Sequence, residues 1–393
     1  MEILYELYFK LLKTVDMRFQ RSLMGKIHWD KRLIGITGGR GVGKTTLLLQ
    51  YLKKKYLGAN KEGLYVSMDH IWFSRNSLLD LADNFSKTGG KVLVLDEVHK
   101  YPNWSREIKN IYDFYPEIQI IFTGSSLLEI LNASADLSRR AVLYSLKGLS
   151  YREFLEFDQG IGFPVLNFED IIQHHVEMSY EISGRVKPLQ FWKPYLEHGH
   201  YPFYKEAGEL YHQQLQSVVN LILEVELPLL RKVEIAYISK IKQLLAILAD
   251  SVPFIPNISK LSEKIGINRT TLLSYLHFLQ ESELIYGLYQ NNEGISILQK
   301  PEKIYLNNPN LAFALGNKVD IGNIRETFFL NQVSDGHELT LPPGFDFQVD
   351  RKWLVEVGGK NKKLIKECDV IAMDDLEIGH DKKIPLWLFG FLY

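Results

Sequence analysis

The sequence has a single cysteine, almost no net charge and no long apolar run. Cys368 is the only thiol in 393 residues, which excludes an intramolecular disulfide and a four-cysteine metal site and fits a reducing compartment. The 46 Lys and Arg residues balance 47 Asp and Glu residues, so the chain lacks the overall positive charge that attracts nucleic acid or anionic membranes. The apolar N-terminal stretch is interrupted by charged residues, unlike a signal peptide. We therefore expect a cytoplasmic protein that does not enter a membrane.

Residues 31–150 show the pattern of a doubly wound α/β domain. Short apolar runs without polar alternation are typical of strands buried on both faces of a parallel sheet, and segments with helical spacing separate them. We predict strands at residues 33–37, 64–67, 92–95, 118–123 and 142–146. This alternation predicts a parallel sheet with helices on both faces.

The rest of the chain divides into four further parts. We expect an N-terminal helix within residues 1–30 and a helical connector, punctuated by prolines, over residues 151–240. Residues 241–308 form the next part. Residues 309–393 form a separate α/β unit, in which the spacing predicts first a helix and then strands.

Residues 241–308 have the pattern of a winged helix. Two compact predicted helices are joined at Gly266, Ile267 and Asn268, and a hairpin-like pair of apolar runs follows around residues 291–294. Between residues 258 and 285 three cations face three carboxylates, so the segment has no excess positive charge for DNA phosphates. We favour a structural or protein-binding winged helix over a DNA reader.

A phosphate-binding loop follows the first predicted strand. The segment GGRGVGKTT contains the pattern G-x-x-x-x-G-K-[ST], and a predicted helix follows it, as the mechanism of this motif requires. Backbone N–H groups of such a loop surround the β-phosphate, the lysine reaches the β- and γ-phosphates, and the Thr45 hydroxyl binds Mg²⁺. The expected nucleotide-binding residues are Gly38, Gly39, Arg40, Gly41, Val42, Gly43, Lys44, Thr45 and Thr46.

Two acidic residues follow the third predicted strand. The carboxyl ends of strands are where open α/β sheets place ligands, so Asp96 is expected to hold Mg²⁺ together with Thr45. Glu97 is expected to polarise the attacking water and accept its proton. The alternative is a pair of solvated carboxylates, which the upstream phosphate loop makes the weaker interpretation.

Further candidates follow the fourth predicted strand. Thr123, Ser125 or Ser126 is placed to hydrogen-bond the γ-phosphate or the water, although the two serines suit a helix N-cap equally well. Arg139 and Arg140 precede the fifth strand, where a guanidinium can act as an arginine finger on a neighbouring subunit in a homo-oligomer. Surface salt bridging is the alternative for both arginines.

These segments resemble a group of prokaryotic AAA-type ATPases with a winged helix and a C-terminal domain of unknown function. The matching pieces are GGRGVGKTTLL, LDEVHK, FTGSS, LSYREFL, HGHYPF and KIYLNN. The resemblance implies an ATPase core that uses ATP and Mg²⁺, and a C-terminal fold of the restriction-endonuclease type whose nuclease signature is often incomplete. The group commonly has Gly-Arg before the fifth strand, where this chain has Ser138-Arg139-Arg140, so the finger residue stays open.

The C-terminal unit contains a second set of acidic residues. Nucleases with a D…E-x-K arrangement hold Mg²⁺ with paired carboxylates and orient water with the lysine. Here Asp346, Glu356 and the earlier Glu326 supply carboxylates, but Gly358 occupies the lysine position. Lys360 shares the strand face of Glu356 and substitutes for that lysine if the strand continues through Gly358. We predict a degenerate nuclease-like fold, and histidine spacing gives no sign of a zinc site.

The sequence thus predicts ATP binding and Mg²⁺-dependent hydrolysis, coupled to conformational change in the winged-helix and C-terminal parts. Two alternatives stay open. One is a DNA-directed defence or mobile-element ATPase, and the other is a nucleotide switch that binds ATP without hydrolysing it. The sequence names no protein partner.

Overall fold

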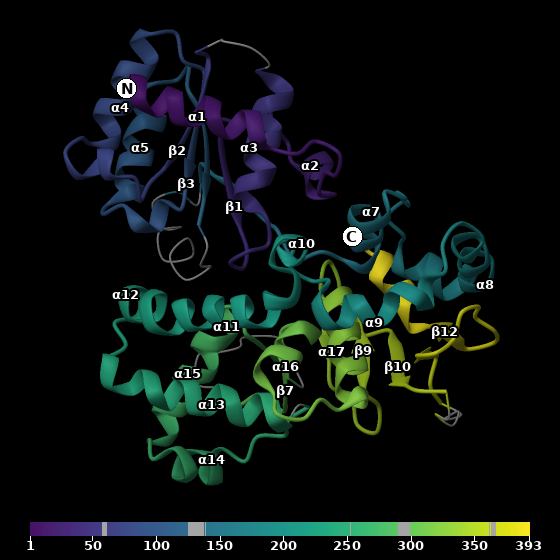
Figure 1. The fold of residues 1–393 in the computed structure, drawn as a ribbon. Coiled ribbons are helices and arrows are strands. Elements are labelled where there is room, and N and C mark those ends of the chain that lie inside the picture. The colour runs from purple at the N-terminus through teal and green to yellow at the C-terminus, as the bar shows by residue number, and fades with distance from the viewer. Residues whose placement is uncertain are drawn as a thin grey trace. The chain divides into compact units, whose positions relative to one another are not determined.

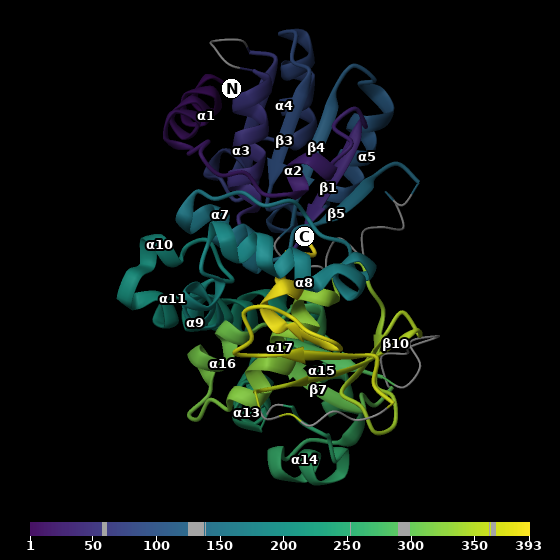
Figure 2. The same ribbon diagram turned by 90° about the vertical axis from the view of Figure 1, so that its right-hand side faces the viewer.

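The structure is a computed structural model of the whole chain. It describes residues 1–56, 61–124, 137, 139–251, 253–289, 299–360, 362 and 367–393. The chain forms two compact units, Met1–Gly148 and Leu149–Tyr393. Figures 1 and 2 show the elements of each unit in two views.

The first unit is built on a parallel five-stranded sheet. Its strands are β1 (Leu33–Thr37), β2 (Gly63–Ser67), β3 (Val92–Asp96), β4 (Gln119–Thr123) and β5 (Val142–Ser145). The strand order is β2-β3-β4-β1-β5, and every neighbouring pair is parallel. The α/β class and the parallel sheet predicted from the sequence are confirmed, and each strand lies within a residue or so of its predicted range.

Helices cover both faces of this sheet. They are α1 (Glu2–Thr14), α2 (Leu23–Lys26), α3 (Lys44–Lys55), α4 (Leu78–Lys87) and α5 (Trp104–Phe114). Helices α1 and α3 contact each other on one face, and α4 and α5 contact each other on the opposite face (Figure 1). Strands β1 and β3 and most of β4 are therefore buried on both sides, which explains their continuous apolar sequences.

Local signals in the sequence set the start of several helices. Ser77 and Asp80 form a reciprocal capping box at the start of α4, because each side chain accepts a hydrogen bond from the backbone N–H of the other. Ser150 and Glu153 do the same at the start of α7 (Tyr151–Gln159). These contacts satisfy N–H groups that have no partner inside the helix.

The second unit begins with a helical region. Its helices are α7, α8 (Phe168–Arg185), α9 (Pro188–His198), α10 (Tyr204–Ala207), α11 (Tyr211–Leu221), α12 (Leu227–Arg231) and α13 (Ile238–Ser251). A short π-helix, Ile222–Glu226, joins α11 to α12. The helical region predicted after the first sheet is therefore present.

Two helices and a two-stranded sheet follow in the second unit. Helices α14 (Ile258–Ile265) and α15 (Arg269–Glu281) meet at Gly266, which adopts the left-handed conformation with φ 73°. Strands β6 (Ile285–Leu288) and β7 (Lys303–Leu306) then pair antiparallel. The predicted turn at residues 291–294 lies outside the described residues, and the winged-helix assignment stays a prediction.

The last part of the chain combines helices with a mixed sheet. Helices α16 (Pro309–Leu315) and α17 (Ile321–Val333) precede the strands β8 (Leu339–Thr340), β9 (Phe347–Val349), β10 (Trp353–Gly358), β11 (Val370–Met373) and β12 (Lys383–Pro385). The order is β12-β11-β10-β9-β8, with β10, β11 and β12 parallel and the β8-β9 and β9-β10 pairs antiparallel. Helix α17 packs on β10 and on the final 3₁₀ segment Leu386–Phe391.

Among the described residues, no helix combines the length and the apolar character that crossing a membrane requires.

Candidate nucleotide site

The phosphate loop turns sharply between β1 and α3. Gly38, Gly41 and Gly43 all have positive φ, at 138°, 84° and 99°. A Cβ atom on Gly38 would lie 2.1 Å from the carbonyl oxygen of Leu146, so no other residue fits there without moving the segment after β5. These positions need glycine for its backbone freedom and its lack of a side chain.

Lys44 is the first residue of α3, and it is buried with an exposed fraction of 8%. Its Nζ donates to the carbonyl oxygens of Gly38 and Gly39, both at 2.7 Å. The ammonium group therefore lies inside the curve of the loop that precedes it. This is where a lysine meets phosphate oxygens in phosphate-loop proteins.

Asp96 lies at the carboxyl end of β3 and gathers three hydroxyl donors. Thr45 donates to Oδ2 at 2.6 Å and Tyr65 donates to the same oxygen at 2.7 Å. Thr123 donates to Oδ1. Because β3 lies between β2 and β4, the two neighbouring strands bring Tyr65 and Thr123 to the carboxylate from opposite sides.

Tyr65 keeps its hydroxyl proton across the physiological range. Burial raises the pKa of this phenol far above its ordinary value, and the charge of Asp96 raises it further. Tyr65 is therefore a fixed donor to the Asp96 carboxylate. It lay unnoticed in the sequence because a tyrosine in an apolar strand has the pattern of an ordinary core residue.

Glu97 is held in an unusual backbone conformation with φ 55°. Its N–H donates to the Thr123 hydroxyl at 3.0 Å. Its carboxylate forms ion pairs with Lys100 and, at 3.7 Å, with Arg40 of the phosphate loop. The loop and the end of β3 are thus connected through charge as well as through the Thr45–Asp96 hydrogen bond.

Lys100 is anchored on its other side by Asp69, at 2.8 Å. Burial alone would lower the pKa of Lys100, but its hydrogen bonds to Asp69 and Glu97 more than offset this, and the pKa is raised. Lys100 therefore stays charged beside Glu97. The buried His99 behaves oppositely, because burial lowers its pKa to about 4 despite the attraction of Glu97.

Arg21 holds the phosphate loop to the segment after β5. Its guanidinium donates to the carbonyl oxygens of Val42 at 2.6 Å and of Lys147 and Gly148 at 2.8 Å. The side chain is buried, with an exposed fraction of 6%. The sequence analysis missed Arg21, since a lone arginine outside any motif gives no local signal.

The structure describes Arg140, Arg139 and Thr46 among the remaining sequence candidates. Arg140 pairs with Asp113 of α5, through Nε to Oδ1 at 3.1 Å and a second nitrogen to Oδ2 at 3.2 Å. Arg139 is exposed, as is Thr46 at the start of α3. Ser125 and Ser126 lie outside the described residues. The assignment of an arginine finger therefore stays a prediction.

The acidic cluster of the second unit contains a different lysine from the one expected. Strand β10 ends at Gly358, so Lys360 does not continue the strand face of Glu356 and is exposed. Lys362 takes this place, with Nζ 2.5 Å from Glu356 and 3.1 Å from Asp346. Burial raises the pKa of Glu356 even though Lys362 opposes this shift.

Glu326 of α17 pairs with residues of β7 and not with Lys362. It accepts hydrogen bonds from Lys303 at 2.7 Å and from Tyr305 at 2.8 Å. Within the described residues no group of three or more acidic, histidine or cysteine side chains is arranged to hold a metal. The carboxylates of the predicted nuclease-like site are thus paired with lysines.

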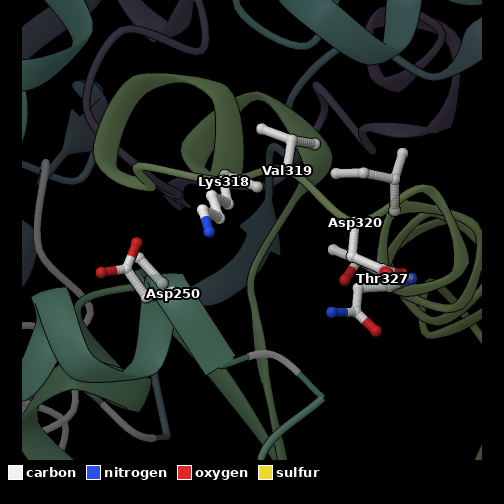
Figure 3. Close-up of a pocket in the computed structure, with 9 residues that line it drawn as sticks. Asp250, Lys318, Val319, Asp320 and Thr327 are labelled. Carbon is white, nitrogen blue, oxygen red and sulfur yellow. Dashed lines mark hydrogen bonds between the residues drawn. The ribbon is translucent and has the colours of Figure 1, made fainter.

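A small cavity lies between α13 and the segment that joins α16 to α17 (Figure 3). Its lining residues include Asp250, Lys318, Asp320 and Thr327. Its volume of about 20 Å³ has room for about one water molecule and is far below that of a ligand pocket. Asp250 accepts two hydrogen bonds from Asn317, at 2.7 and 2.9 Å, which indicates a structural role.

Comparison with known families agrees with this geometry. Residues 30–155 match the model of an AAA domain, and residues 190–321 match the model of a domain of unknown function. Residues 30–155 therefore carry an AAA-type domain, as the resemblance implied for the first unit. The winged-helix and nuclease-like parts of that resemblance stay predictions.

The chain is similar along most of its length to an uncharacterized protein of Methanocaldococcus jannaschii. The two are 28% identical over 416 aligned positions, covering 96% of this chain and 87% of the relative. Among solved structures, a Walker-type ATPase of Pyrococcus abyssi has 14% identity and a TM-score of 0.42, covering 77% of this chain and 99% of that one. AMPPCP-bound DnaA of Aquifex aeolicus has 16% identity and a TM-score of 0.27, covering 70% and 87%.

Proposed function

We propose that this protein binds ATP with Mg²⁺ and hydrolyses it to ADP and phosphate. The observation that carries the proposal is the 2.6 Å hydrogen bond between the Thr45 hydroxyl and Asp96 Oδ2. It joins the two elements of the motif, one from the phosphate loop and one from the end of β3, within a single site. The AAA-domain match over residues 30–155 supports the same class of reaction.

The residues at this point fit Mg²⁺ bound together with a nucleotide. A hydroxyl and a carboxylate are oxygen donors, which Mg²⁺ prefers, and sites of this kind complete the coordination with phosphate and water oxygens. When bound, Mg²⁺ neutralises charge on the β- and γ-phosphates. Thr45 and Asp96 are the residues that would hold it, and Tyr65 and Thr123 orient the Asp96 carboxylate through their hydrogen bonds.

Each remaining residue has a role that follows from its position. The loop from Gly38 to Gly43 offers backbone N–H groups to the phosphates, and Lys44 supplies a buried positive charge beside them. Glu97 accepts the proton of the attacking water. For this role its carboxylate must exchange its ion pairs with Lys100 and Arg40 for a contact with water.

We propose that the predicted nuclease-like site does not cleave DNA. Nucleases of this type use paired carboxylates to bind Mg²⁺. Here the Lys362 ammonium lies between Asp346 and Glu356 and offsets part of their negative charge. Among the described residues these two carboxylates also belong to no group of three or more potential metal ligands. We further propose that the nucleotide state of the first unit alters the conformation of the second, which would make its helical and C-terminal parts a surface for a partner.

The test is phosphate release from Mg²⁺-ATP by the parent protein and by Glu97→Gln and Lys44→Ala. Glu97→Gln should keep ATP binding while turnover falls by about 10²-fold or more, because a general base contributes this much. Lys44→Ala should lose tight ATP binding. Glu117→Gln, a change of the same kind at an exposed carboxylate before β4, serves as the control and should behave like the parent.

Turnover by Glu97→Gln at the parent rate would refute the role of Glu97. ATP binding by the parent without phosphate release would replace the ATPase by a nucleotide switch. Added duplex DNA tests the second unit in the same assay. DNA cleavage that is lost in Glu356→Ala would contradict the degenerate nuclease-like site, and DNA-stimulated turnover that weakens steeply with salt would favour a DNA-directed ATPase.

A further inference from the structure

Helix α1 carries apolar side chains on two faces. One face packs against β2 and α3. The residues of this buried face are Leu4, Tyr5 and Tyr8. On another face Ile3, Leu7 and Leu11 are 53%, 36% and 39% exposed. They follow one another at intervals of four residues and therefore form one continuous ridge, unlike the isolated apolar residues found on most surfaces.

Charged residues flank this ridge in a definite order. Glu2 and Glu6 lie in the first half of the helix and Lys10 and Lys13 in the second. At 100° per residue all four fall on the same side of the ridge. Counted along the sequence from residue 8, the two glutamates and the two lysines lie at similar separations. Glu6 and Lys10 are each two positions away, and Glu2 and Lys13 are six and five positions away.

We propose that this ridge binds the same ridge of a second copy of the chain, with the two α1 helices antiparallel and centred near residue 8. A twofold axis then places the same flank of both helices together in opposite directions. Glu6 meets the partner's Lys10, whereas Glu2 and Lys13 lie farther from the ridge and outside the contact. The leucines at positions 7 and 11 of the two copies alternate along the contact.

The order of charges selects this arrangement over its alternatives. In a parallel pair the charged flanks of the two copies would lie on opposite sides of the contact, so Glu6 and Lys10 would have no partner of opposite charge. A lipid surface fits poorly, because helices that lie on membranes carry Lys and Arg along the polar face, whereas this flank begins with two carboxylates. Glu2 and Lys13 also suit the dipole of their own helix, so Glu6 and Lys10 in its middle are the informative pair.

The contact is small, so the association should be weak. Three apolar side chains per copy give an interface well below the roughly 1,200 Å² that specific stable complexes bury. We therefore expect a dimer that is populated only at high protein concentration, with a dissociation constant of about 10 µM to 1 mM.

Sedimentation equilibrium over this concentration range tests the proposal through charge reversal. Glu6→Lys and Lys10→Glu should each weaken self-association about tenfold, since each turns two attractive contacts of the dimer into repulsive ones. The double variant Glu6→Lys/Lys10→Glu should associate like the parent, because the reversal restores opposite charges. Lys26→Glu, at an exposed residue of α2, is the control for a change of charge alone.

Mixing the two single variants gives the most specific result. In a mixed dimer the Glu6→Lys copy presents two lysines to the two glutamates of the Lys10→Glu copy. Association should therefore recover in the mixture, although each variant alone associates about tenfold more weakly than the parent. Leu7→Ala should weaken the parent dimer, because it shortens a side chain at the centre of the ridge.

A parent that stays monomeric at about 1 mM, or single variants that associate as the parent does, would overturn the proposal. So would a mixture that fails to associate while the parent dimerises, because another surface would then form the dimer. Binding to anionic lipid vesicles that requires Leu7, without self-association, would assign the ridge to a membrane surface instead.

Discussion

Replacing Arg21 with methionine should loosen the phosphate loop and weaken nucleotide binding. The guanidinium holds three carbonyl oxygens, those of Val42, Lys147 and Gly148, at 2.6 to 2.8 Å. Methionine keeps most of the apolar stem but offers no donor. The loop then loses its direct connection to the segment after β5, against which Gly38 packs.

The expected magnitude follows from these three hydrogen bonds. A hydrogen bond from a charged group contributes about 1.5–3 kcal/mol, which gives an upper bound of about 4.5–9 kcal/mol for the set. Two effects reduce this figure. The Lys147 carbonyl is only partly buried and can bind water in the variant, and the variant no longer buries a charge. We expect a loss of about 2–4 kcal/mol in the free energy of unfolding of the first unit.

Urea unfolding with and without Mg²⁺-ATP measures this loss. The transition that ATP shifts to higher urea belongs to the unit that binds it, which separates the two units of the chain. Arg18→Met is the matched control, because Arg18 lies three positions away, is 91% exposed and pairs with Asp16 at the surface. If Arg21→Met unfolds at the same urea concentration as Arg18→Met and binds ATP like the parent, the assigned role of Arg21 is wrong.

Two further changes test Tyr65 and His99, two buried residues of the candidate nucleotide site. Tyr65→Phe removes one donor to the Asp96 carboxylate while the Thr45 hydrogen bond remains, so the Mg²⁺ requirement for turnover should rise about tenfold; an unchanged Mg²⁺ dependence would make Tyr65 a packing residue. His99 has a pKa of about 4 in the folded protein, against about 6.5 unfolded. The unfolded chain therefore takes up a proton first as the pH falls, and the parent should lose about 2 kcal/mol of stability between pH 8 and 5. His99→Gln should lack this loss, and equal pH slopes for both proteins would contradict it.

The sequence was sufficient for most of the first unit because strands β1 to β4 are almost fully buried. The edge strand β5 differs, since its residues alternate between half-buried and exposed. Residues 33–37 and 92–95 are continuous apolar runs, which few structures other than a parallel sheet accommodate. The phosphate loop was equally predictable, since its glycines and the Lys-Thr pair lie within one short stretch of the sequence. Asp96 could be placed because strand ends in such a sheet meet at one edge.

Contacts between distant segments could not be read from the sequence. Arg21 reaches Val42 and Gly148 only because the fold brings three segments together. The lysine beside Glu356 was assigned to Lys360 on the assumption that the strand continued. Strand β10 ends at Gly358 instead, and the chain turns so that Lys362 faces Glu356. A strand end is set by pairing with neighbours, which periodicity does not reveal.

The Lys44 ammonium group already donates hydrogen bonds to two carbonyl oxygens of its own loop. A bound ligand must compete with these oxygens for the lysine. A ligand that attracts Lys44 must draw it from the carbonyl oxygens of Gly38 and Gly39, which then depend on water. An anion with a single phosphate offers the ammonium group fewer charged oxygens than a polyphosphate does. A polyphosphate can engage Lys44 and the loop N–H groups together, so we expect it to displace the lysine's own contacts more readily than inorganic phosphate does.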